Sequence, residues 1–171
     1  MTDRRARFEA LALPHLDAAY SLARWLSRSS ADAEDIVQEA MLRAFRAFDG
    51  ARPETLKPWL LAIVRNCFRD HVGPKGGQQP LEDHIHALRF DGPDPETEAA
   101  WTSERRRLDA VLALLPPDFR EVLVLREMED MSYRQIAEVT GAPIGTVMSR
   151  LARARTLLKD HWLAGGGDAV H

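Results

Sequence analysis

Three arginines follow a glycine-containing turn near the end of the sequence, in the segment GAPIGTVMSRLARAR at residues 141–155. A guanidinium group can bind phosphate oxygens or the edge of a guanine base, and small side chains beside it let a backbone approach a groove. The same residues could also form an ordinary solvated basic face on a packed helix. The elements around the segment decide between these two interpretations.

The residues that surround these arginines have the spacing of a helix-turn-helix. We expect a short helix over residues 133–139 and a longer one from residue 143 to about residue 162. Ala137 is small enough for the second helix to approach, Gly141 can take the left-handed turn, and Val147 fills the angle between the helices. This turn geometry favours a helix that contacts DNA over a solvated basic face.

The expected second helix has two distinct faces when its residues are placed at 100° steps. The apolar face carries Ile144, Val147, Leu151, Ala154 and Leu158. The opposite face carries Gly145, Ser149, Ala152, Arg153 and Thr156, with Arg150 on one flank and Arg155 on the other. Small residues beside basic ones suit close approach to a DNA groove.

The rest of the chain is predicted to be helical as well. Apolar residues recur with a helical period in five further segments, at residues 8–27, 30–48, 58–72, 99–115 and 119–128. No segment alternates as a strand would, and glycine and proline concentrate at residues 73–97. We predict an all-α fold of two small helical domains, at 1–73 and 99–163, joined by a flexible acidic linker at 74–98 and followed by a flexible tail at 164–171.

The net charge of −3 hides an uneven distribution. Residues 76–100 carry one basic and six acidic side chains, a net of −5, whereas residues 132–159 carry five basic and one acidic, a net of +4. Local charge decides which partners a surface attracts. We therefore expect the basic end to bind DNA and the acidic linker to serve another purpose.

Several classes of function are disfavoured by the composition. A single cysteine, Cys67, excludes an internal disulfide and a cysteine-based zinc site. The pair His84 and His86 lacks further ligands for a metal, and no nucleophile–base pair or glycine-rich phosphate loop stands out. No apolar run approaches the roughly 18–20 residues that span a bilayer, and no signal peptide is evident. We expect a cytoplasmic protein that is not an enzyme, without cofactor, metal, small-molecule substrate or membrane insertion.

Two stretches of the sequence resemble a known family. Residues 115–158, LPPDFREVLVLREMEDMSYRQIAEVTGAPIGTVMSRLARARTLL, resemble region 4 of sigma factors of the extracytoplasmic-function (ECF) group in the sigma-70 family of bacterial RNA polymerase. DAEDIVQEAMLRAFRAF at 32–48 resembles the region 2 helix that binds the polymerase clamp. PWLLAIVRNCFRDH at 58–71 resembles the segment that recognises and melts the promoter −10 element.

The resemblance implies a subunit without catalysis of its own that binds core RNA polymerase at the clamp and flap and directs promoter-specific initiation in a stress or envelope response. It also implies an anti-sigma factor as a partner. The residues that it places at the polymerase are Asp35, Gln38 and Glu39. Those that it places at the −10 element are Phe48, Asn66, Arg65 and Arg69. Those that it places at the −35 element are Tyr133, Arg134, Thr146, Met148, Ser149, Arg150, Ala152 and Arg153.

Some of these assignments have a structural alternative. Phe48 could stack on an unpaired base or lie in the core, and Trp59 is more typical of a core residue than of a base contact. The acidic linker could mimic nucleic acid in a polymerase channel or act only as a tether. HVGPKGG at 71–77 lacks the arginines that many relatives carry there, which suggests fewer phosphate contacts. Met148 stands where a polar or basic residue is common, so the base preference at that position stays open.

Two other functions of a binding protein compete with this interpretation. A sigma-like decoy would capture an anti-sigma factor without reading promoters, and such decoys tend to lose the DNA-reading arginines. This chain keeps Arg150, Arg153 and Arg155. A conventional helix-turn-helix regulator would need a sensory or dimerisation domain before residue 100, and it would leave the acidic helix at 32–48 without a purpose.

Overall fold

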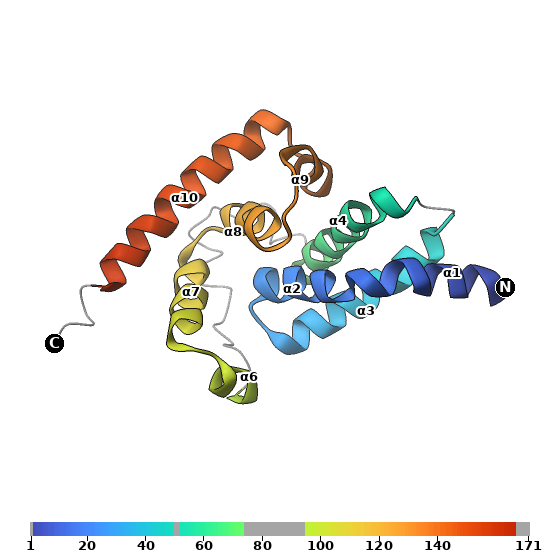
Figure 1. Cartoon of the computed structure of the whole chain (residues 1–171), viewed down its shortest axis with the longest axis horizontal. Helices are drawn as coiled ribbons and strands as arrows, with labels where there is room; N and C mark the ends of the chain where they lie inside the picture. Colours follow the sequence, from blue (N-terminus) through green and yellow to red (C-terminus); the bar gives the residue numbers. More distant parts are fainter. Residues whose placement is uncertain (1, 50–51, 74–94, 167–171) are drawn as a thin grey trace.

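A computed structural model describes residues 2–49, 52–73 and 95–166 of the chain (Figure 1). The regular structure in these ranges is helical. The first group of helices is α1 (Thr2–Ala12), the 3-10 turn η1 (Leu13–His15), α2 (Leu16–Ser27), α3 (Ser30–Ala47) and α4 (Pro53–Val72). The second group is α6 (Pro95–Ala100), α7 (Ser103–Leu114), α8 (Pro117–Leu123), the π-helical turn η2 (Val124–Met128), α9 (Tyr133–Thr140) and α10 (Ile144–Gly166).

The first group packs α2, α3 and α4 around one core. The hairpin between α2 and α3 is set by two local features. Arg28 adopts the left-handed conformation with φ 61° and ends α2, and the Ser29 hydroxyl accepts a hydrogen bond from the amide of Asp32 to begin α3. Apolar side chains that are fully buried between the three helices include Leu22, Ile36, Ala40, Leu60 and Val64.

α1 is held onto this core by Arg4 and Phe8. The Arg4 guanidinium donates hydrogen bonds to the carbonyls of Phe45 and Phe48, each at 2.9 Å, and so satisfies the free end of α3. The Phe8 ring meets the rings of Phe45 and Phe48 edge-on, with centroids 5.4 Å apart in both pairs. These contacts place Phe48 at 2% exposure in the core.

The helices differ from the predicted segments at several ends. The segment 8–27 is interrupted by η1 at Pro14, because proline has no amide to donate to the preceding turn. α4 begins five residues earlier than predicted, so Pro58 lies inside it. The segment 99–115 is divided where Thr102 caps α7. α10 continues to Gly166, so the first residues of the predicted tail are helical.

The second group packs α7, α8, α9 and α10 around Leu112, Val122, Leu125, Ile136 and Leu151. α8 passes directly into η2, and its N-cap is Pro116. α10 runs along the outer side of α7 and α8 (Figure 1). The described part of the chain contains no helix long and apolar enough to cross a membrane.

The two groups pack against each other, with α4 beside α9 and α2 beside α8 (Figure 1). Their apolar side chains join in one buried cluster, and charged side chains cross the boundary. Residues 74–94 of the predicted linker at 74–98 lie outside the described residues. The described residues therefore show two helical groups in contact.

Candidate nucleic-acid interface

The turn between α9 and α10 is built from local hydrogen bonds. Ser132 and Gln135 form a reciprocal capping box at the start of α9, with distances of 3.2 Å and 3.0 Å. Gly141 ends α9 in the left-handed conformation at φ 69°, and its amide donates to the Ala137 carbonyl at 2.9 Å. Val147 is fully buried between the helices. The structure thus has the helix-turn-helix that these residues predict.

The outer face of α10 is exposed as its periodicity predicts. Gly145, Ser149, Ala152, Arg153 and Thr156 are all exposed, and Val147, Leu151 and Ala154 are buried on the opposite side. Ile144 departs from the prediction, because it is 44% exposed at the first turn. The residues that the sequence places at the −35 element are all accessible; Arg134, Met148, Ser149, Ala152 and Arg153 are exposed, and Tyr133, Thr146 and Arg150 are half-buried.

Arginines on the flanks of α10 pair with carboxylates of neighbouring elements. Arg155 donates to Glu127 in η2 at 3.0 Å, and Arg150 lies 3.9 Å from Asp118 at the start of α8. Arg153 points away from the core on the exposed face. The basic face is therefore partly neutralised at its flanks and positive at its centre.

Arg126 positions the start of α9. Its guanidinium donates to the Met131 carbonyl at 2.8 Å and stacks over the ring of Tyr133, 4.9 Å from the centroid. This contact spans the turn in which Asp130 takes a positive φ of 54°. Sequence reasoning missed Arg126, because an arginine at the end of an amphipathic helix is typical of a solvated position.

The residues predicted for the −10 element do not share one environment. Asn66 and Arg69 are exposed on α4. Arg65 is buried at 6% exposure and pairs with Glu121 of α8, which is 3% exposed. The ring of Phe48 is in the core against Phe8, so this conformation offers no Phe48 surface for stacking.

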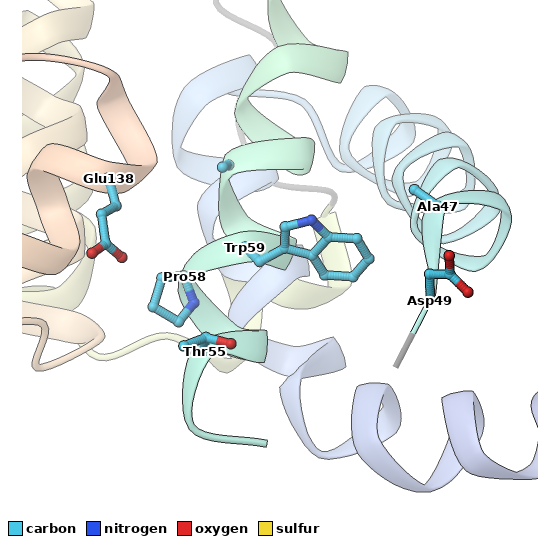
Figure 2. A pocket seen from close by; sticks show the side chains of 7 residues that line it. Ala47, Asp49, Thr55, Pro58, Trp59 and Glu138 are labelled. Carbon is cyan, nitrogen blue, oxygen red and sulfur yellow. The ribbon is translucent and has the colours of Figure 1, made fainter. Parts of the chain in front are cut away.

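An open hollow of about 460 Å³ lies where α3, α4 and α9 meet (Figure 2). Trp59 is half-buried at the hollow with its ring toward Ala47 and Asp49, and Glu138 of α9 lies on the opposite side, across Pro58 (Figure 2). The hollow is lined by Ala47, Asp49, Thr55, Pro58, Trp59, Ala62 and Glu138. Trp59 is thus neither fully buried in the core nor fully exposed to solvent. Residues 50–51, which follow Asp49 at the hollow, lie outside the described residues.

The predicted polymerase-binding residues lie on the outer side of α3. Asp35 and Gln38 are exposed, and Glu39 is half-buried. The Glu39 carboxylate accepts from Arg43 at 2.9 Å, and Arg43 also pairs with Asp70 of α4 at 2.7 Å. Arg43 therefore fixes the orientation of Glu39 beside the two exposed residues.

Burial perturbs two ionisable groups at the boundary between the helix groups. Burial raises the pKa of Glu121, and the charge and hydrogen bond of Arg65 oppose that rise. Burial also lowers the pKa of Arg120 to about 10, so its guanidinium stays charged at neutral pH. Neither residue was singled out from the sequence, because the helical pattern does not reveal which charged side chains face another domain.

Comparison with known proteins separates the same two parts of the chain. Residues 11–75 match the family described as Sigma-70 region 2, and residues 105–158 match Sigma-70, region 4. The chain is 35% identical over 156 residues to the ECF RNA polymerase sigma factor SigE of Mycolicibacterium smegmatis, covering 90% of this chain and 61% of that relative, which is less than two thirds of its length. It is 33% identical over 149 residues to the ECF RNA polymerase sigma-E factor of Haemophilus influenzae, covering 81% of this chain and 78% of that relative.

Two solved structures share the arrangement of helices. The sigma factor RpoE from Bartonella quintana, in complex with the anti-sigma factor NepR, superposes with a TM-score of 0.71 at 28% identity over 91% of this chain and 96% of its own. CnrH, in complex with the cytosolic domain of CnrY, superposes with a TM-score of 0.68 at 27% identity over 94% of this chain and 90% of its own.

Proposed function

Since the chain belongs to the extracytoplasmic-function sigma factors of the sigma-70 family, we propose that it binds core RNA polymerase and directs transcription from a defined set of promoters. The observation that carries this proposal is the exposed face of α10, where Arg153 stands among small residues next to an ordered turn. The protein acts in the cytoplasm as a specificity subunit and leaves catalysis to the polymerase.

The second helix group reads the −35 element in this proposal. Arg150 and Arg153 contact guanine edges or phosphates, and Thr146 and Ser149 allow the backbone to approach the bases. Tyr133 and Arg134 add phosphate contacts from α9. The positive charge at the centre of the face is the feature that supports this orientation.

The first helix group binds the polymerase and the −10 element. Asp35, Gln38 and Glu39 contact the clamp from the outer side of α3, and the second group contacts the flap. Asn66 and Arg69 bind the unpaired −10 strand next to the hollow at Trp59, where an aromatic wall suits base stacking. Phe48 supports this surface from the core rather than stacking on a base, since its ring is packed against Phe8.

An anti-sigma factor restrains the protein, and a stress or envelope signal releases it. Similar proteins are named sigma-E factors, and one of the solved structures above holds the sigma factor RpoE with the anti-sigma factor NepR, while the other holds CnrH with the cytosolic domain of CnrY.

Run-off transcription with core polymerase on a genomic promoter library tests the proposal. Arg153→Ala should lose transcription that depends on the −35 element and keep core binding, whereas Asp35→Ala should weaken core binding. Lys159→Ala removes an exposed charge two turns farther along α10 and serves as the matched control. Failure of the unaltered chain to co-purify with core polymerase would refute the proposal, whatever its affinity for DNA.

A further inference from the structure

One guanidinium group lies between the two proposed surfaces of the first helix group. Arg43 of α3 donates from Nε to the Glu39 carboxylate at 2.9 Å and from Nη1 to the Asp70 carboxylate of α4 at 2.7 Å. The hydrogen bonds to Asp70 and Glu39 raise the pKa of Arg43, so the guanidinium is fully charged at neutral pH. Glu39 belongs to the proposed polymerase surface, and Asp70 lies one turn beyond Asn66 of the proposed −10 surface.

The cluster of Glu39, Arg43 and Asp70 holds one positive and two negative charges. In the described part of the chain, the ion pairs of both carboxylates are those with Arg43. The Cys67 thiol lies beside the cluster, and burial raises its pKa, so it stays neutral and adds no charge. One guanidinium is therefore shared between a carboxylate on α3 and a carboxylate on α4.

Asp70 stands where its charge would oppose a bound DNA strand. Asn66 and Asp70 are four residues apart and share a face of α4, and Arg69 directly precedes Asp70. The Asp70 side chain is 63% exposed. A carboxylate near a bound phosphate repels it and counteracts the attraction that Arg69 supplies. The proposed −10 surface therefore needs a cation at Asp70.

The cluster contributes little to holding α3 and α4 together. The two helices already share buried apolar side chains such as Ile36 and Val64. The side chains of Arg43 and Glu39 are 39% and 46% exposed, and exposed ion pairs add little to stability. The position of Arg43 between two binding surfaces therefore matters more than its contribution to the fold.

We propose that Arg43 is a positioning residue for both surfaces: it orients the Glu39 carboxylate toward the polymerase clamp and neutralises Asp70 beside the −10 strand. The proposal deepens the proposed function and rests on it, because it concerns the same two surfaces. Arg43 acts through the two carboxylates and needs no contact with either partner. A planar guanidinium suits this role, since it directs separate donors to two carboxylates at once.

The first test measures binding of the −10 strand. Holoenzyme is titrated onto a labelled single-stranded oligonucleotide with the non-template −10 sequence of a promoter found by run-off transcription. Arg43→Met removes the charge, so Asp70 should repel the strand and the affinity should fall about threefold. Adding Asp70→Asn to this variant removes the repulsion and should restore the affinity of the unaltered chain. Arg43→Lys keeps the charge and should also keep the affinity.

The second test measures binding to core polymerase in the absence of DNA. Arg43→Met should weaken binding about threefold, because Glu39 loses the donor that orients it. In a chain that already carries Glu39→Ala, the same change should have no further effect, since the oriented carboxylate is gone. Asp70→Asn should not restore core binding to Arg43→Met, because Asp70 belongs to the other surface.

Two control variants each remove a carboxylate that does not pair with Arg43. Asp17→Asn, at an exposed position of α2, and Glu104→Gln, at an exposed position of α7, should leave both affinities unchanged. Circular dichroism checks that every variant keeps the helix content of the unaltered chain. If Arg43→Met does not fold, Arg43→Gln carries both tests with a polar, uncharged end group.

The outcomes separate this proposal from a structural role and from the proposed function. If Arg43 only held the helices together, strand binding and core binding would fall together and Asp70→Asn would rescue neither. That result, or full strand binding by Arg43→Met, would overturn the neutralisation of Asp70. An equal loss of core binding with and without the Glu39 carboxylate would overturn its orientation by Arg43. Failure of the unaltered chain to bind core polymerase would instead refute the proposed function, and this proposal with it.

Discussion

Arg155 of α10 donates a hydrogen bond to the Glu127 carboxylate at 3.0 Å, and this bond ties the second helix of the helix-turn-helix to the π-helical turn η2. The hydrogen bond to Glu127 raises the pKa of Arg155, and one with Tyr133 adds to the rise. The side chains of Arg155 and Glu127 are about half exposed, at 47% and 57%. An exposed pair contributes at most about 1 kcal/mol to stability, so its position beside the exposed basic face of α10 matters more than its strength.

Glu127→Gln should therefore strengthen DNA binding with little effect on folding. The change removes a carboxylate near the basic face and leaves Arg155 able to turn toward a phosphate. We expect the slope of log affinity against log salt concentration to steepen by the equivalent of about one additional released counterion. The free energy of unfolding should change by less than about 1 kcal/mol. Titrating holoenzyme onto a promoter at several salt concentrations measures the slope. Glu104→Gln is the control, and an equal slope in both variants would contradict the prediction.

Two glycines in the helix-turn-helix should respond in opposite ways to alanine. Gly141 has a φ of 69°, and a Cβ there would meet no atom within 4 Å, so the cost of Gly141→Ala is the backbone conformation itself. We expect the free energy of unfolding to fall by about 1–2 kcal/mol. Urea denaturation of the full chain measures this change.

Gly145 lies in the first turn of α10 on the exposed face, and a Cβ there would also meet no atom within 4 Å. Gly145→Ala should leave folding unchanged or stabilise it by up to about 1 kcal/mol, because alanine favours a helix. Its methyl group would stand between the helix and the bases, so transcription dependent on the −35 element should decrease. A Gly145→Ala variant that is more stable and equally active would show that this turn does not approach DNA.

The sequence determines the helix-turn-helix because the signals there are local. Ser132 has its capping partner three residues away, and Gly141 is the residue type that a left-handed turn favours. The exposed face of α10 follows from its period in the same way. These features need no knowledge of what packs against them.

The contacts between the helix groups could not be predicted in this way. Arg65 and Asp109 occupy helix positions that the pattern assigns to solvent, and each becomes buried only because a partner distant in sequence covers it. Phe48 remained open between core and base contact, because the answer depends on Phe8, which is distant in sequence but packs against the Phe48 ring. The break at Pro14 was missed since the apolar period continues through it.

Arg120 should be the most sensitive of the buried arginines to substitution. Arg120→Met would remove the side-chain donor from the buried carbonyls of Leu112, Leu115 and Trp25, and Leu112 would keep only the amide of Leu115. Unsatisfied buried groups cost about 1–3 kcal/mol each, so we expect a loss of about 3 kcal/mol or more in the free energy of unfolding. Urea denaturation measures the loss. Arg7→Met, at an exposed position of α1, should change stability by less than about 0.5 kcal/mol. Equal stability of the two variants would mean that the guanidinium is not required there.

Met148 offers a direct test of how α10 reads bases. Its side chain is 52% exposed, next to Ser149 on the proposed DNA-binding side of α10, and has no strong hydrogen-bonding group. An apolar side chain in the major groove recognises the methyl group of thymine. Replacing each thymine of the −35 element by uracil removes that methyl group alone. We expect one such replacement to weaken promoter binding by the holoenzyme about fivefold, which corresponds to about 1 kcal/mol.

The same uracil replacement should have no effect on Met148→Ala, because the contact is already lost, while other replacements should affect both proteins equally. Ser149→Ala is the matched control, since it alters the neighbouring residue and keeps the methionine. If each uracil replacement weakens promoter binding by the same factor in the unaltered chain and in Met148→Ala, then Met148 does not touch a thymine methyl group. The base preference at this position would then arise from other side chains of α10, such as Arg150 and Arg153, whose guanidinium groups can bind guanine edges.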